Sequence, residues 1–247
     1  MADSLMFKYL KASLKAMSEF RLNFIVGSLI MIFTNLIFMG SIIYLGYRFS
    51  GIGNLTTANI IFALTVMNLA YAFGMNFFSG ISRMQDLIIR GELDRFLTKP
   101  ISIYKHILIH RTNPYALGEI ITSLILLSLN PLSMFPLIFL FSITGAILIN
   151  LNVYVINLLP MFIDINRPIG LFDAYIQFAT NPPEVYNSLL KFISLFIIPG
   201  AMVGFGAVYA IKSNSWAIIY FAYLIFSVVL FFILSKLAVK KYRSAGY

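Results

Sequence analysis

Long apolar runs and short polar segments alternate along the whole chain. A helix that crosses a membrane needs about 20 predominantly apolar residues, and runs near or above that length recur throughout the sequence. They predict membrane-crossing helices at Leu22 to Tyr47, Ala58 to Gly80, Tyr115 to Leu129, Phe135 to Ile163, and Trp216 to Leu237. The third of these runs is the shortest.

The part of the chain before the last run is interrupted by prolines and glycines. Gly170 to Thr180 is apolar but too short for a full crossing, and Asn181-Pro182-Pro183 ends it. The apolar stretch from Val185 to Tyr209 is then broken at Pro199-Gly200, because proline disrupts the hydrogen bonding of a helix interior. Two interpretations of this region are open.

One interpretation is a re-entrant hairpin at residues 182–211, which enters the membrane from the outer face and returns there. With Gly170 to Thr180 counted as a crossing, the chain then crosses six times. Non-helical backbone at membrane depth is tolerated where protein encloses it or where it lines a cavity. The other interpretation makes Leu189 to Tyr209 the fifth crossing and leaves Asp164 to Asn187 in the cytosol.

The N-terminal segment combines lysines with apolar residues at helical spacing. Within Leu5 to Phe20, Lys8, Lys11 and Lys15 fall on one side of a helix and apolar residues on the other. This pattern predicts an amphipathic helix over residues 1–21 that lies in the headgroup region of a membrane. The alternative is a solvated lead-in to the first crossing.

The composition also favours a membrane protein. Of the 247 residues, 60% are hydrophobic and 11% are charged, and the mean hydropathy is +0.89. Soluble domains are about 45–50% apolar and about 25% charged, and a soluble helical protein needs polar faces that these runs lack. We expect an all-α polytopic membrane protein, with residues 1–247 in a single transmembrane domain. It would comprise six transmembrane helices, the N-terminal interfacial helix and the re-entrant hairpin before the last helix.

The excess of positive charge is distributed as a topology signal. The formal net charge is +9, but Lys and Arg gather at the ends of apolar runs rather than on a face that fits nucleic acid. With a cytosolic N-terminus and six crossings, 15 of the 18 Lys and Arg residues lie on the cytosolic side. Basic residues favour that side of a lipid bilayer. We therefore expect a protein of the cell (cytoplasmic or inner) membrane with both termini in the cytosol.

Few residues offer chemistry of their own. A catalytic site needs converging acids, bases or nucleophiles, and the sequence contains no phosphate-binding loop that ends in Gly-Lys-Ser/Thr. There is no Cys, and although His106 and His110 share a helical face, no third ligand for a metal is near them in sequence. We expect neither enzyme activity nor a cofactor in this chain.

A small set of polar side chains lies within the apolar runs. Glu119 and Asp173 are ionisable, and such residues either form proton or ion relays or are paired near the membrane surface. Uncharged amides at several positions indicate either a polar strip along a translocation pathway or hydrogen bonds between helices. The candidate pathway residues are Asn68, Asn76, Asn150 and Asn157.

A compact charged segment, IIRGELDRFLTKP, runs from Ile88 to Pro100 within a loop at residues 81–111. It mixes both signs of charge with Leu and Phe, whereas a helix that only lies on a lipid surface is basic. Mixed charge with exposed apolar anchors, here Leu93 and Phe96, favours docking into a groove of another protein. The alternative is an ordinary solvated loop. The candidate docking residues are Arg90, Gly91, Glu92, Leu93, Asp94, Arg95 and Phe96.

Three segments together resemble one branch of the type-2 ABC exporter permeases. GELDRFLTKP at residues 91–100 is similar to the family's Gly-x-Leu-Asp-x-x-Leu-x-Arg-Pro element, with Lys99 in place of Arg. Residues 181–211 resemble the Pro-rich segment before the last helix, although residues 207–210 lack the customary Pro before Ala. KKYRSAGY at residues 240–247 resembles the closing Tyr-x-Ser-Ala-Gly signature. The three segments follow the family's order and spacing.

The resemblance implies a permease subunit of an ATP-driven ABC exporter. Such a subunit pairs with an identical or related second permease and with separate ABC ATP-binding subunits, which hold ATP and Mg. Residues 83–100 would then couple the permease to the ATPase, and the hairpin, with Pro182, Pro199 and Gly200, would form the outer gate. Two other classes stay open. A secondary transporter usually shows repeated halves and a broken-helix ion site, and a membrane interaction protein would use the same helices without transport.

Overall fold

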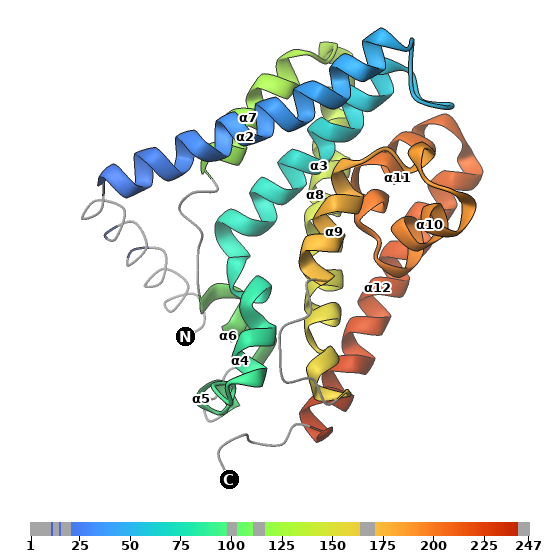
Figure 1. Cartoon of the computed structure of the whole chain (residues 1–247). Coiled ribbons are helices and arrows are strands. Elements are labelled where there is room, and N and C mark those ends of the chain that lie inside the picture. Colours follow the sequence, from blue (N-terminus) through green and yellow to red (C-terminus); the bar gives the residue numbers. More distant parts are fainter. Residues whose placement is uncertain are drawn as a thin grey trace.

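The structure is a computed structural model, and it describes residues 11, 15, 21–97, 103–110, 117–163 and 171–241. Within these ranges the chain is helical throughout, apart from turns and one isolated bridge between Ile52 and Leu55 (Figure 1). The expected all-α class is therefore confirmed. Of the expected interfacial helix at residues 1–21, all but Lys11, Lys15 and Arg21 lie outside the described residues.

Four long helices correspond to four of the expected crossings. Each is long and apolar enough to cross a membrane, because at 1.5 Å per residue a helix of about 20 residues matches the hydrocarbon core. They are α2 (Arg21–Arg48), α3 (Thr57–Phe78), α8 (Phe135–Asn157) and α12 (Asn214–Lys241). Thr56 caps the N-terminus of α3, because its side chain accepts a hydrogen bond from the backbone N–H of Asn59 at 3.4 Å.

Shorter elements connect the long helices. Two of them, α7 and α9, occupy the expected third and fifth crossings but have only 12 and 10 residues, about 18 and 15 Å of helix. The count of six crossings therefore stays a prediction. The short elements are η1 (Ser79–Arg83), α4 (Met84–Ile89), α5 (Asp94–Leu97), α6 (Ile103–His110), α7 (Leu117–Ser128), η3 (Leu132–Met134), η4 (Leu159–Met161), α9 (Leu171–Thr180), η5 (Pro183–Val185), α10 (Ser188–Phe192), the π-helical η6 (Ile193–Ile197) and α11 (Gly200–Lys212).

The expected break at Pro199-Gly200 is present. The helical stretch from Ser188 to Ile197 and helix α11 meet at an angle of 97°, and Pro199 occupies the N-cap position of α11. Proline lacks a backbone N–H and its ring clashes with the preceding turn, so it favours a helix start at this point. The bend by itself fits both a broken crossing and a re-entrant hairpin.

Helix α11 forms the centre of the bundle. All its residues from Gly200 to Ala210 are buried, and it packs against α3, α8, α9 and α12. A Cβ atom on Gly200 would lie 2.0 Å from the carbonyl oxygen of Tyr175 in α9, and one on Gly204 would lie 2.4 Å from that of Ala63 in α3. Small residues let helix backbones approach closely in a membrane. Helices α2 and α7 lie side by side and pack on α3 at the edge of the bundle (Figure 1).

We expect Gly200→Ala to destabilise the protein and Gly40→Ala to stabilise it. The first change forces a methyl group into the backbone of α9, and such overpacking costs about 1–3 kcal/mol. Gly40 lies inside α2, and a Cβ atom added there would meet no other atom within 4 Å, so Ala gains about 0.5–1 kcal/mol of helix propensity. Thermal unfolding of the detergent-purified variants measures both effects. Equal midpoints for the two variants would contradict the close packing of α11 on α9.

Candidate functional site

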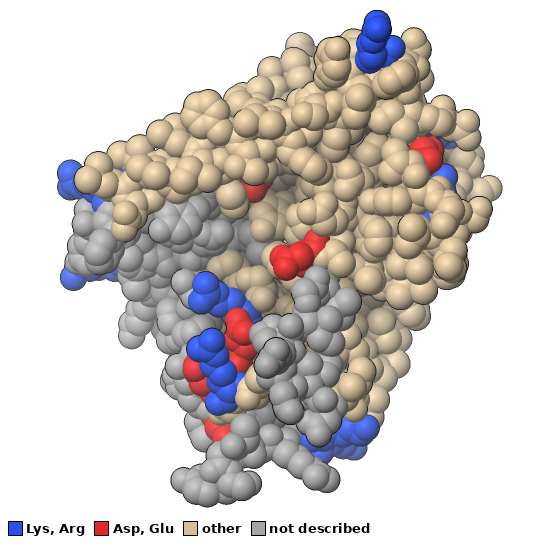
Figure 2. Space-filling model, viewed as in Figure 1, with Lys and Arg blue, Asp and Glu red and all other residues tan. Residues whose placement is uncertain are grey.

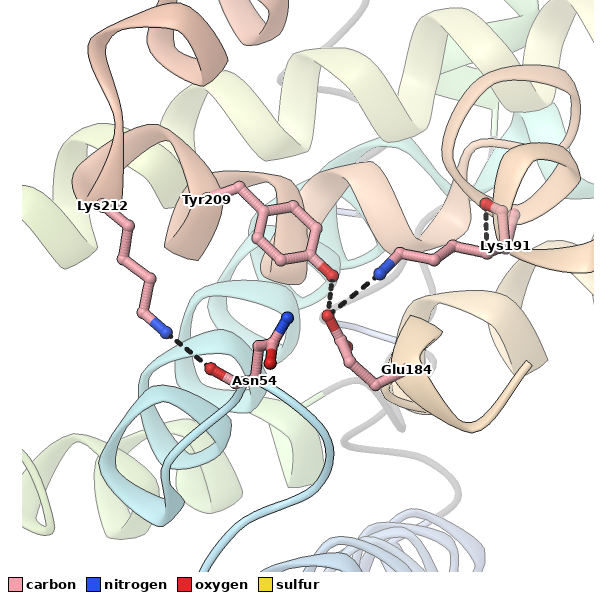
Figure 3. A network of polar contacts seen from close by, with 6 residues as sticks. Asn54, Glu184, Lys191, Tyr209 and Lys212 are labelled. Carbon is pink, nitrogen blue, oxygen red and sulfur yellow. Dashed lines mark hydrogen bonds and ion pairs between the residues drawn. The ribbon is translucent and has the colours of Figure 1, made fainter. Parts of the chain in front are cut away.

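A polar network joins the two ends of the broken helical segment (Figure 3). Tyr209, near the end of α11, donates a hydrogen bond to Glu184 Oε1 in η5, and Lys191 Nζ lies 3.3 Å from the same oxygen. The Glu184 side chain is only 6% exposed. A buried carboxylate requires such partners because its charge is costly to remove from water. The network therefore brings Glu184, just before the broken segment, next to Tyr209 near its end.

The loop between α2 and α3 closes over the same network. Lys212 Nζ donates to the backbone oxygen of Asn54 at 2.9 Å (Figure 3). A Cβ atom on Gly53 would lie 2.8 Å from Cγ of Glu184, so the loop backbone contacts the Glu184 side chain directly. The broken segment is thus held at its ends by both a charged network and the α2–α3 loop.

The predicted gate residues lie inside this region. Pro182, Pro199 and Gly200 are all buried, the first before η5 and the other two at the start of α11. Their role as a gate stays a prediction. The sequence interpretation did not include Glu184 or Tyr209, although Glu184 is the single acidic residue in the segment from 174 to 247.

A second polar cluster lies where α2, α3 and α7 meet. Glu119 Oε2 accepts hydrogen bonds from Asn35 Nδ2 at 2.7 Å and from Asn68 Nδ2 at 3.1 Å. Ser123 Oγ donates to Asn68 Oδ1 at 2.5 Å. Glu119 and Asn68 are buried, so these bonds connect three helices away from water. The sequence indicates Glu119 and Asn68 as candidate polar residues. Asn35 and Ser123 stand among apolar residues, and no local pattern indicates that they bond to Glu119 and Asn68.

The other candidate pathway residues do not join this cluster. Asn157 donates to the backbone oxygen of Ile81 at 2.7 Å and thereby fixes η1 to the end of α8. Asn150 donates to the oxygen of Ala146 in its own helix at 2.8 Å. The side chain of Asn76 lies outside the described residues. Asn157 and Asn150 thus make separate hydrogen bonds to backbone oxygens. The role of the candidate residues in a translocation pathway stays a prediction.

The charged segment is folded against its own chain. Gly91 ends α4 with a positive φ of 69°, a conformation that glycine adopts without strain. Leu93 and Phe96 are only 1% and 2% exposed. The Phe96 ring packs edge-on against His106 of α6, with centroids 4.8 Å apart. Leu93 and Tyr154 of α8 border the same gap of about 10 Å³.

This burial corrects one expectation. Leu93 and Phe96 are not exposed anchors for another protein, because α6 and α8 already cover them. What the segment presents at its surface is charge: Arg90 is exposed, and Glu92 and Asp94 are half-buried. The side chain of Arg95 lies outside the described residues.

The charges gather near the short helices at one end of the molecule. Figure 2 shows Lys, Arg, Asp and Glu side chains of both signs there, whereas the broad surface over the long helices is almost uncharged. Further basic residues, Lys236, Lys240 and Lys241, end α12. Among the described residues, no three His, Cys, Asp or Glu side chains come together in a way that fits a metal ion. The arrangement suits a membrane-embedded bundle with an almost uncharged middle and charged residues toward its ends.

We expect Leu93→Ala and Phe96→Ala each to destabilise the isolated chain, because each empties a buried position. Such truncations typically cost about 2–5 kcal/mol. Leu189→Ala is the matched control, since Leu189 is 67% exposed. Thermal unfolding in detergent, with no other protein present, measures the effect. Unchanged unfolding midpoints for Leu93→Ala and Phe96→Ala would indicate that these side chains are exposed and not buried.

Comparison with known families gives one match. A family model described as "ABC-2 family transporter protein" matches residues 29–246, which is most of the chain. Neither a comparison with individually curated proteins nor one with solved structures gives a match.

Proposed function

The chain belongs to the ABC-2 transporter family, and from this premise we propose that it is a permease subunit of an ATP-driven exporter. Members of the family form the transmembrane component of ABC transporters and are not themselves catalytic. In our proposal the chain forms a translocation pathway with an identical or related second permease. Separate ABC subunits bind and hydrolyse ATP with Mg and drive the permease through residues 83–100.

The observation that carries this proposal is the construction of the charged segment. Leu93 and Phe96 fix α5 to α6 and α8, and this holds Arg90, Glu92 and Asp94 in a defined arrangement at the surface. A fixed set of charges sets the register and the rate of association with a complementary partner. In our proposal the ATP-binding subunit docks on this fixed charged surface.

The orientation of the chain is part of the proposal. The bond from Tyr209 to Glu184 and the bond from Lys212 to Asn54 place both ends of the broken segment beside the α2–α3 loop. This arrangement supports a hairpin that enters and leaves on one face, in a chain with six crossings. Since 15 of the 18 Lys and Arg residues fall on the cytosolic side when the sequence is arranged in six crossings, we infer that the hairpin is outside and both termini are cytosolic.

Arg90→Glu tests the docking surface. Reversing an exposed charge should repel a complementary partner without emptying any buried position, and we expect the tagged chain to retain its ATP-binding subunit about tenfold less well, equivalent to ~1.4 kcal/mol. Arg48→Glu is the control, since Arg48 is also exposed but lies at the other end of the bundle. The measurement is co-purification from the native membrane at low and high salt.

The result also separates the function classes. If an ATP-binding subunit co-purifies with the wild-type chain and with Arg48→Glu but is lost with Arg90→Glu, the coupling role is supported. If no such subunit accompanies the wild-type chain, a secondary transporter or an interaction protein is favoured instead. Full retention by Arg90→Glu would place the docking surface elsewhere.

Single cysteines test the orientation, because the native chain has none. Asn54→Cys, Asn187→Cys and Ser213→Cys should all react with an impermeant thiol reagent in intact cells, and Ser244→Cys should react only after lysis. Asn54 contributes its backbone oxygen to the network, so its side chain can be replaced. Labelling of Asn187 and Ser213 from opposite sides would instead favour a full crossing between them.

A further inference from the structure

A cavity of about 450 Å³ lies beside the α2–α3 loop, at the end of the bundle that holds the Glu184 network. The end of α2, the start of α3, the turn between α7 and α8, and the end of α11 all contribute to its walls. The volume falls within the range of about 300–1,000 Å³ that is usual for small-molecule sites. It is therefore large enough to take the headgroup of an amphiphile.

Lys212 gives this cavity a positive charge. It is the one charged side chain among the described residues of the lining, and it is exposed, so a ligand can reach it. No carboxylate of the described residues forms an ion pair with it. Glu184, in the neighbouring network, is bound by Lys191 and Tyr209 instead. The charge of Lys212 is thus left without a counter-charge within the described chain.

Lys212 and Asn59 also keep hydrogen-bond donors for a ligand. A lysine ammonium has three donors, and Lys212 Nζ gives one to the backbone oxygen of Asn54 at 2.9 Å. A second goes to the side-chain oxygen of Asn59 at 2.9 Å, in the amide orientation that also accepts from Thr56 Oγ1 at 2.7 Å. The third donor and the Nδ2 group of Asn59 then have no acceptor among the described residues. Donors beside a positive charge favour an anion with several acceptor oxygens, such as a phosphate.

The other walls of the cavity are apolar and open outward. Ile61, Phe62 and Val208 are buried and form its inner side. Leu129 and Ile211 also line it, yet they are 54% and 42% exposed, so they form an apolar rim. A small inorganic anion would use only the polar part of this site, whereas an anionic amphiphile would use both parts.

The residues around the cavity are those that mark the surface of a membrane. Tyr47 lines the cavity one residue before the end of α2, and Lys212 is the last residue of α11. Trp216 lies in the first turn of α12, where its ring packs against Tyr209 with centroids 4.8 Å apart. Tyr, Trp and Lys concentrate where helices leave the hydrocarbon core. The cavity is therefore at the level of the lipid headgroups.

We propose that this cavity binds an anionic membrane lipid, with the phosphate of its headgroup at Lys212 and Asn59 and an acyl chain along Leu129 and Ile211. The phosphate supplies the negative charge and the acceptor oxygens for the donors of the site, and the acyl chain covers the apolar rim. The membrane itself supplies this ligand. The inference therefore goes beyond the proposed permease function and does not rest on an ATPase.

The test uses two photoactivatable lipids with the chain in phosphatidylcholine nanodiscs. Both carry the same diazirine-bearing acyl chain, but one has the anionic phosphatidylglycerol headgroup and the other the zwitterionic phosphatidylcholine headgroup. We expect the anionic probe to label peptides that contain residues 129–134 and 208–212 about two- to fivefold more strongly, as an ion pair at an exposed site implies. Equal labelling by the two probes would overturn the proposal.

Substitutions at Lys212 assign the preference to its charge. Lys212→Gln should remove the preference for the anionic probe, and Lys212→Arg should keep it, because Arg retains the positive charge. Arg48→Gln is the matched control, since Arg48 is an exposed cation at the end of α2 that does not line the cavity. An undiminished preference in Lys212→Gln, or an equal loss in Arg48→Gln, would show a general effect of surface charge and overturn the site.

Two further measurements test the cavity and the source of the anion. Ala58→Trp should remove the preference because Ala58 lines the cavity and a large ring fills it; a folded variant that keeps the preference would contradict the site. Excess inorganic phosphate, at an ionic strength held constant with chloride, should leave the labelling unchanged because it lacks an acyl chain. Displacement would assign the site to a free anion and overturn the lipid. All these results are obtained without an ATP-binding subunit, so this proposal and the permease proposal fail separately.

Discussion

The fold depends on the contact of one short helix with the backbones of its neighbours. Gly200 and Gly204 bring α11 against the peptide groups of Tyr175 and Ala63. Lipid supplies no hydrophobic driving force between helices, so close packing of this kind has to provide the attraction. The break before α11 also leaves backbone groups without helical partners, and such groups are tolerated at membrane depth only inside protein. The same close contacts of α11 with its neighbours therefore hold the helices together and enclose the broken backbone.

Charged residues differ in burial between the two ends of the bundle. At one end, a carboxylate at Glu184 is buried between Tyr209 and Lys191, and the charges serve to hold the chain together. At the other end, Leu93 and Phe96 are buried, Arg90 is exposed, and Glu92 and Asp94 are half-buried. A buried charge fixes a segment to its own chain, whereas in our proposal an exposed charge such as that of Arg90 sets the register of a partner. This difference in burial, rather than net charge alone, separates the Glu184 network from the proposed docking surface.

Local signals in the sequence predicted part of this arrangement. The four long helices and the break at Pro199 follow from apolar length and from the missing N–H of proline, which act within one segment. The burial of Leu93 and Phe96 could not be read locally, because a short helix has the same pattern whether its apolar side meets another protein or its own chain. The pairing of Glu184 with Tyr209 joins residues 25 positions apart, and no periodicity indicates such a pair.

Helix α8 packs both on α11 and on the short helices beside the charged segment. Near its end beside the charged segment, Tyr154 borders the gap that Leu93 also lines. Further along, a Cβ atom on Gly145 would lie 2.9 Å from Val203 of α11, and α11 continues to the network at Tyr209. Closely packed interiors transmit displacement because they have little free volume to absorb it. In our proposal, a shift of the charged segment is passed through α8 and α11 to the network around Glu184.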